Sequence, residues 1–151
     1  MITIGDMIGE QADELSRKFL AIGDVHKIPL GKSEHITPKD GMDYRSKYLI
    51  ILGFNSKGDA IGGVVINSNI SLKLPPAITD YYFPVSTMKL PFLHHNSFVN
   101  CTHIIRVRKD KFNRDTYRGR VEDTELLLSI KETLKECPTI SRQELAEFSI
   151  V

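Results

Sequence analysis

Two apolar segments joined by a short turn constrain the fold of this chain more than any other feature. The first, Tyr48 to Phe54, reads YLIILGF, and the second runs from Ile61 to Ile70. Residues 55–59 between them, Asn-Ser-Lys-Gly-Asp, are typical of a β-hairpin turn. Because the first segment is continuously apolar, we expect it to be a central strand. Gly62 and Gly63 in the second segment indicate a bulge or a close backbone approach.

Shorter segments with strand-like composition lie on either side of this hairpin. We expect strands over Asp24–Leu30, over Asp80–Thr87 at a sheet edge, and over Ser97–Val107. Residues 31–43 have the composition of a loop, and Pro75-Pro76 favours extended chain. Since no crossover helix separates the strands, antiparallel pairing is favoured over parallel pairing.

Helical periodicity occurs at both ends of the chain. Apolar residues recur at helical spacing over residues 6–20 and from Leu126 to Leu134, and Pro138 ends the second pattern. Ser141 and Glu144 fit a capping box, which predicts a last helix over residues 142–148. We therefore expect a mainly β fold with flanking helices, built as a small antiparallel barrel or curled sheet. The 151 residues are expected to form one domain, with a barrel core over 22–121 and C-terminal helices over 122–148.

Cysteine usage and the apolar runs indicate the class of protein. Cys101 and Cys137 form no CxxC pair and have no histidine at a metal-binding spacing, so we expect reduced, buried thiols in a cytoplasmic protein. No apolar run is long enough for a membrane span, and the N-terminal residues lack the pattern of a secretion signal. Adjacent His94 and His95 point apart on extended chain, and we do not expect them to hold a metal.

Positive charge gathers in one segment of a chain whose net charge is only +1. Between Arg106 and Arg120 there are seven cations and two acids, and we call this segment the basic run. Such a run can attract a polyanion, and Phe112 and Tyr117 would then be able to stack on bases. The alternative is a solvated charge run with Phe112 in the core. The helical segment that follows is expected to be a lid on the barrel or a dimer contact.

Four segments occur in an order that matches a known family. They are Gly23–Leu30 with its Gly-Asp-Val start, Tyr44–Ile51, Val64–Ile70 with Leu74-Pro75 after it, and Ser97–Ile104 followed by Lys111-Phe112 and Gly119-Arg120-Val121. Together they resemble the MazF/PemK family of toxin endoribonucleases over about residues 22 to 136.

The resemblance implies a compact SH3-like barrel that forms a homodimer. It further implies a toxin of a toxin–antitoxin system that cleaves single-stranded RNA without a metal or cofactor and is silenced by an antitoxin protein. In that chemistry the ribose 2′-hydroxyl attacks the adjacent phosphorus, an arginine neutralises the developing charge, and a hydroxyl holds the phosphate. The alternative is a non-catalytic binding module on the same barrel that recognises RNA or a protein partner.

The resemblance also implies which residues would act. The family's arginine falls on Arg45 or, because no proline follows Arg45 here, on Lys47. The family's threonine falls on Asn67, with the hydroxyl of Ser68 next to it, although neighbours in a strand face opposite sides. The family's glutamine is replaced by His103, which suits proton transfer within its predicted strand. Each of these residues also has a non-functional interpretation. Arg45 would be a surface residue, Asn67 and Ser68 would be ordinary turn residues, and His103 would be a half-buried strand residue. The residues expected to contact RNA are Lys47, Arg106, Arg108, Lys109, Lys111 and Arg114.

Overall fold

The structure is a computed structural model, and it describes residues 20–34, 36 and 41–150. The helix expected over residues 6–20 falls outside these ranges except for its last residue. Within the described part, no helix is long and apolar enough to span a membrane.

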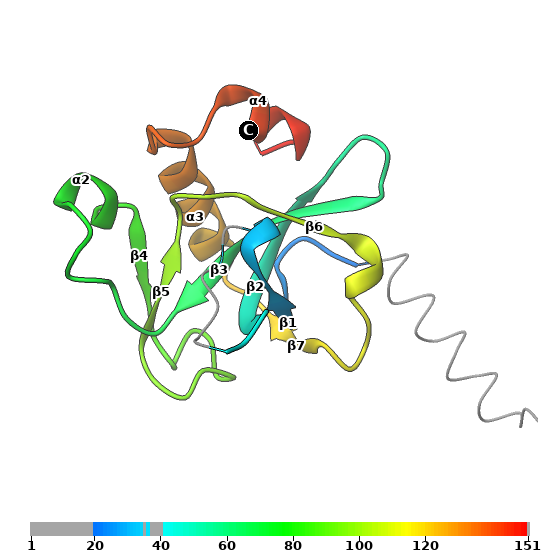
Figure 1. Cartoon of the computed structure of the whole chain (residues 1–151), viewed down its shortest axis with the longest axis horizontal. Coiled ribbons are helices and arrows are strands. Elements are labelled where there is room, and N and C mark those ends of the chain that lie inside the picture. Colours follow the sequence, from blue (N-terminus) through cyan, green and yellow to red (C-terminus); the bar gives the residue numbers. More distant parts are fainter. Residues whose placement is uncertain (1–19, 35, 37–40, 151) are drawn as a thin grey trace, which may run out of the picture.

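Seven antiparallel strands form one sheet, in the order β4-β5-β3-β2-β1-β7, with β6 also pairing with β3. The strands are β1 (Asp24–Leu30), β2 (Arg45–Phe54), β3 (Ala60–Asn67), β4 (Tyr82–Val85), β5 (Ser97–Asn100), β6 (Ile105–Arg108) and β7 (Tyr117–Arg120). The helices are α2 (Pro76–Thr79), α3 (Thr124–Glu136) and α4 (Arg142–Glu147), with 3-10 turns η1 (Lys32–Glu34) and η2 (Lys109–Lys111). Figure 1 shows β4 and β5 at the left of the molecule and β1 and β7 near its lower middle, with the C-terminus beside α4.

The predicted hairpin is confirmed as β2 and β3. Asn55 fixes its turn, because Asn55 Oδ1 accepts from the backbone N–H groups of Asp59 and Ala60, both at 3.1 Å. A bulge interrupts the pairing between Ile51 and Gly53, opposite the two glycines of β3. A Cβ placed on Gly62 would lie 2.4 Å from the ring of Phe148, so the backbone here is also in close contact with the C-terminal segment. Both expectations for the glycine pair are therefore confirmed.

The single strand predicted over Ser97–Val107 is wrong, because the chain turns at Cys101 and Thr102 and forms β5 and β6 instead. Asn100 holds this turn by accepting from the Thr102 backbone N–H at 3.0 Å. β5 pairs with the end of β3, and β6 pairs with its beginning. Both parts of the predicted strand therefore pair with the same neighbour, β3.

Two other local expectations also need correction. The chain at Pro75-Pro76 does not stay extended, because α2 begins at Pro76, where a proline fits the first helical turn. β7 was not foreseen, and it lies within the basic run, paired with β1.

Alternating side chains give the sheet two apolar faces. On one face, Ile50 and Val64 pack with the buried side of α3, contributed by Leu126, Ile130 and Leu134. On the other face, Leu49, Ile51, Ile61, Val65, Val107 and Phe112 form a second cluster. Phe112 is fully buried, so its placement in the core is confirmed and its predicted stacking on bases is wrong. α3 covers the first of these faces of the sheet, as expected for a helical lid, whereas α4 has no buried residue.

The capping box is confirmed, since Ser141 Oγ accepts from Glu144 N and the Glu144 carboxylate accepts from Ser141 N. The mainly β, antiparallel class with C-terminal helices is confirmed as well. The end strands of the path, β4 and β7, do not pair with each other in the described part, so the sheet is not closed as a barrel.

Candidate anion-binding site

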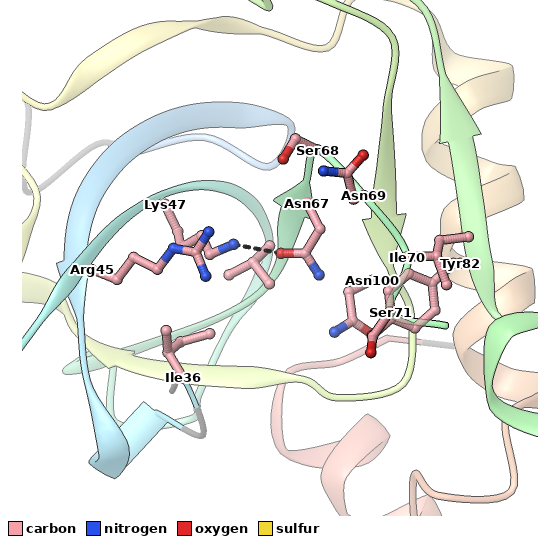
Figure 2. A pocket seen from close by; sticks show the side chains of 11 residues that line it. Ile36, Arg45, Lys47, Asn67, Ser68, Asn69, Ile70, Ser71, Tyr82 and Asn100 are labelled. Atoms are coloured by element: carbon pink, nitrogen blue, oxygen red, sulfur yellow. Dashed lines mark hydrogen bonds between the residues drawn. The ribbon is translucent and has the colours of Figure 1, made fainter. Parts of the chain in front are cut away.

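A polar hollow of about 420 Å³ lies where β2 begins and β3 ends, and we call it the first hollow (Figure 2). Alternation along the strands places Arg45 and Lys47 of β2 on the same side as Asn67 of β3. Tyr82 and Asn100 are paired across β4 and β5 and complete the opposite wall. In Figure 2 the Arg45 and Lys47 side chains extend together toward Asn67. The structure therefore brings the two candidate cations, Arg45 and Lys47, beside Asn67.

Hydrogen bonds fix how both asparagine amides are oriented. The Lys47 ammonium donates to Asn67 Oδ1 at 2.7 Å, and an ammonium can only donate, so the Asn67 NH2 group remains as a donor. Asn100 Oδ1 accepts from the backbone N–H and the hydroxyl of Thr102, so the Asn100 NH2 group is likewise left to donate. Burial raises the pKa of Tyr82, so its hydroxyl stays protonated at neutral pH. The wall of the hollow is thus rich in hydrogen-bond donors.

A second hollow, of about 170 Å³, adjoins the first. The two share Arg45, Lys47 and Ser68, while His94 and His95 line only the second. Asn67 lines the first hollow, and Ser68, one residue beyond the end of β3, lines both. Because Ser68 lies beyond the end of β3, strand alternation does not place it on the opposite side from Asn67. Ser68 therefore lines the same hollows as Arg45 and Lys47.

The charged residues that line these hollows, among those the structure describes, are all cations. Among the described residues that line either of them there is no aspartate or glutamate. Arg45 is exposed, and it forms no ion pair within the part of the chain that the structure describes. An anion that enters here would meet cations and N–H groups, without a competing carboxylate from the described lining residues.

The basic run differs in this respect, because acids pair with its cations, and three of these acids come from distant parts of the chain. Arg106 pairs with Glu147 at 3.0 Å, Lys111 with Glu34 at 2.8 Å, and Arg120 with Asp24 at 2.7 Å; Arg108 pairs with Asp110. Lys109 and Arg114 also have interaction partners. None of the cations in this run lines either hollow. The expectation that the run contacts RNA stays a prediction, and these contacts limit how many of its charges are available.

His103 does not join the other candidate residues. It is exposed in the connection between β5 and β6 and lines neither hollow, so its predicted place within a strand is wrong. Tyr82, Asn100 and His95 were not singled out as site residues from the sequence. Tyr82 and Asn100 meet through the β4–β5 register, and His95 lies in the connection between those strands.

His26 is a buried titratable side chain with a strongly lowered pKa, and it lines neither hollow. It is 1% exposed, and its Nδ1 is 2.8 Å from Thr116 Oγ1. Burial is the main reason that its pKa falls from 6.5 to about 4; the Asp24 carboxylate opposes the fall and Arg118 adds to it. The imidazole is therefore neutral at pH 7.

Comparisons with known proteins add no family to this geometry. No protein-family model matches the chain, and no curated protein matches it significantly. The resemblance to the MazF/PemK family rests on the four segments of sequence quoted above.

Proposed function

We propose that the two hollows bind single-stranded RNA by its phosphate backbone and that the protein is a metal-independent endoribonuclease. The observation that carries this proposal is the donor set of the first hollow, in which a guanidinium, an ammonium and two amide NH2 groups converge with no carboxylate among the described lining residues. Arginine and lysine bind phosphate through charge-assisted hydrogen bonds, and the arginine fork matches the spacing of two phosphate oxygens.

The same donors suit the chemistry of RNA cleavage. When a ribose 2′-hydroxyl attacks the adjacent phosphorus, the phosphorane carries more negative charge than the phosphodiester. Fixed cations at this point lower the barrier more than they lower the energy of the bound RNA, which is the condition for catalysis. We assign charge stabilisation to Arg45 and Lys47, and phosphate positioning to Asn67 and to Ser68, which lines both hollows.

The finer parts of this proposal rest on the sequence resemblance. They are an SH3-like barrel, a homodimer, control by an antitoxin protein and a cytoplasmic location. The antiparallel pairing of the seven strands in one sheet is consistent with the first of these.

One observation favours the alternative of a non-catalytic binding module. The position of the family's threonine is occupied by Asn67, whose Oδ1 accepts from Lys47 at 2.7 Å. An amide can hydrogen-bond a phosphate but supplies no hydroxyl, so this pair is consistent with RNA binding alone. Catalysis must then come from Arg45 and the residues around it, which makes Arg45 the decisive side chain.

The test is incubation of the purified protein with a long unstructured RNA in EDTA, beside an Arg45→Ala variant. Arg142→Ala, at an exposed arginine of α4 outside both hollows, is the matched control. We expect wild type and Arg142→Ala to cleave equally, and Arg45→Ala to be slower by about 100-fold or more. If the folded wild type binds RNA without cleaving it, the protein is the non-catalytic binding module. If Arg45→Ala cleaves as fast as wild type, the assignment of the catalytic site to Arg45 is refuted.

A further inference from the structure

The second hollow places a titratable side chain beside the cations of the first. His94 and His95 lie in the connection between β4 and β5, and they line this hollow together with Arg45, Lys47 and Ser68. The sequence separates these two groups by more than twenty residues, and the β3–β5 pairing brings them together. Ser97, which follows on β5, lines the same hollow.

His95 is held in the tautomer that can accept a proton. Its Nδ1 lies 3.1 Å from the backbone oxygen of Asn96, and a carbonyl oxygen can only accept, so in the neutral ring Nδ1 carries the hydrogen. Nε2 then carries the lone pair, and no described residue hydrogen-bonds to it. Ser97 Oγ lies 3.4 Å from Nδ1 and adds a weaker contact on the same side of the ring. An imidazole anchored through one nitrogen is oriented to act through the other.

We infer that His95 is the general base of the RNA cleavage and that the second hollow holds the nucleoside whose 2′-hydroxyl attacks. This inference rests on the proposed function. In the reaction, His95 Nε2 takes the proton of the 2′-hydroxyl, and the 2′-oxygen forms a bond to phosphorus. The bond from phosphorus to the 5′-oxygen of the next nucleotide breaks, and that oxygen leaves with the electron pair and takes a proton from solvent. The imidazolium returns its proton to solvent, leaving a 2′,3′-cyclic phosphate and a 5′-hydroxyl.

The charged groups that line the hollow with His95 are cations, which would attract the phosphate next to the attacking hydroxyl. The other titratable residues that line the hollow are Lys27, Arg45, Lys47, Tyr48 and His94, and no acid is among its described lining residues. Lys27 Nζ lies 5.2 Å from the centre of the Tyr48 ring, which keeps this cation at the wall of the hollow. The scissile phosphate would sit on the shared cations, so its neighbouring 2′-hydroxyl would lie on the side of the second hollow, where His95 is.

The experiment compares wild type with His95→Gln, His94→Gln and His103→Gln. Each protein is tested for cleavage of a fluorescent RNA in EDTA and for binding to the 2′-O-methyl form of the same RNA, which has no free 2′-hydroxyl. We expect His95→Gln to slow cleavage by about 100-fold or more while binding is unchanged. The other two variants should lose less. Added imidazole should restore part of the activity of His95→Ala, because a merely structural role would not be rescued by a soluble base.

The outcomes separate this inference from the proposed function. If wild type cleaves and His95→Gln cleaves equally well, or if His94→Gln or His103→Gln causes the larger loss, His95 is not the base, and the proposed nuclease stands. If His95→Gln loses binding together with cleavage and imidazole restores nothing, its role is structural and the inference is wrong. If folded wild type binds RNA without cleaving it, the nuclease and its general base are refuted together.

Discussion

Mild acid should destabilise the folded protein through His26. Its imidazole is almost completely buried, and Thr116 Oγ1 accepts from Nδ1–H, because the Thr116 hydroxyl itself donates to the Asn113 carbonyl at 2.9 Å. Nε2 therefore carries the lone pair, and it is buried with no hydrogen-bond partner among the described residues. Protonation would place a positive charge there without an acceptor, which is why the pKa is lowered to about 4.

The direction of the effect follows from comparing the two states. In the unfolded chain His26 takes up a proton as the pH falls through 6.5, whereas in the folded protein it does so only near 4. Between these values the unfolded state binds more protons, so the free energy of unfolding falls as the pH falls. The stabilisation is fully present above pH 6.5 and is lost on the way down to about pH 4. A separation of about 2.5 pH units, at about 1.4 kcal/mol per unit, corresponds to a loss of about 3 kcal/mol.

Urea unfolding at pH 7.5 and pH 4.5 measures this loss in wild type, in His26→Gln and in the exposed-site control His94→Gln. Carboxylates also titrate over this range, but their contribution is common to the three proteins. We expect the drop in stability to be smaller in His26→Gln than in wild type by about 2–3 kcal/mol, and unchanged in His94→Gln. NMR titration of the His26 ring in wild type gives a second readout that needs no variant. An imidazole that titrates near its ordinary pKa in the folded protein would refute the reasoning.

Three further predictions follow from packing and charge. Gly62→Ala should lower the free energy of unfolding by about 1–3 kcal/mol in a urea titration, because its Cβ would collide with the buried ring of Phe148; unchanged stability would mean that the ring moves freely. Cys101 is buried and its pKa is raised to about 12, chiefly by burial, so a thiol reagent should label it only after unfolding, and rapid labelling of native protein would contradict this. In binding to 2′-O-methyl RNA, Arg45→Gln should reduce the slope of log K against log salt by about 0.7, and Arg106→Gln by less; equal changes would show that the basic run engages RNA as fully as the hollows do.

Local patterns predicted the fold wherever neighbouring residues determine the structure. The β2–β3 hairpin and the capping box of α4 were foreseen because the turn and cap residues lie beside the segments they organise. β7 has the sequence Tyr-Arg-Gly-Arg, with no apolar alternation, and it is a strand because β1 pairs with it across some ninety residues. The break at Cys101 was missed because the side-chain bonds of Asn100 and Thr102 interrupt a sequence whose composition continues to favour a strand.

The candidate site was partly predictable for the same reason. Arg45, Lys47, Asn67 and Ser68 lie within two segments that resemble one family, so the sequence identified them together. The opposite wall was not predictable, because Asn100 and Tyr82 meet only through the register of two short strands. His95 lines the same hollow as Arg45 and Lys47 because of the path of the β4–β5 connection, which no local sequence pattern predicts.

The sequence does not show which cations are already engaged in ion pairs. Two of the acids that pair with the basic run, Glu34 and Asp24, are buried, and they lie far from it along the chain. If Lys111 or Arg120 turned toward a phosphate, it would leave a buried carboxylate without its partner, and that cost would offset the new contact. Arg45 makes no such exchange, because it forms no ion pair within the described residues. A phosphate bound to Arg45 would therefore gain the electrostatic attraction without breaking an ion pair of the described residues. Under the proposed function, we expect the few cations of the hollows to contribute more to RNA affinity than the longer basic run.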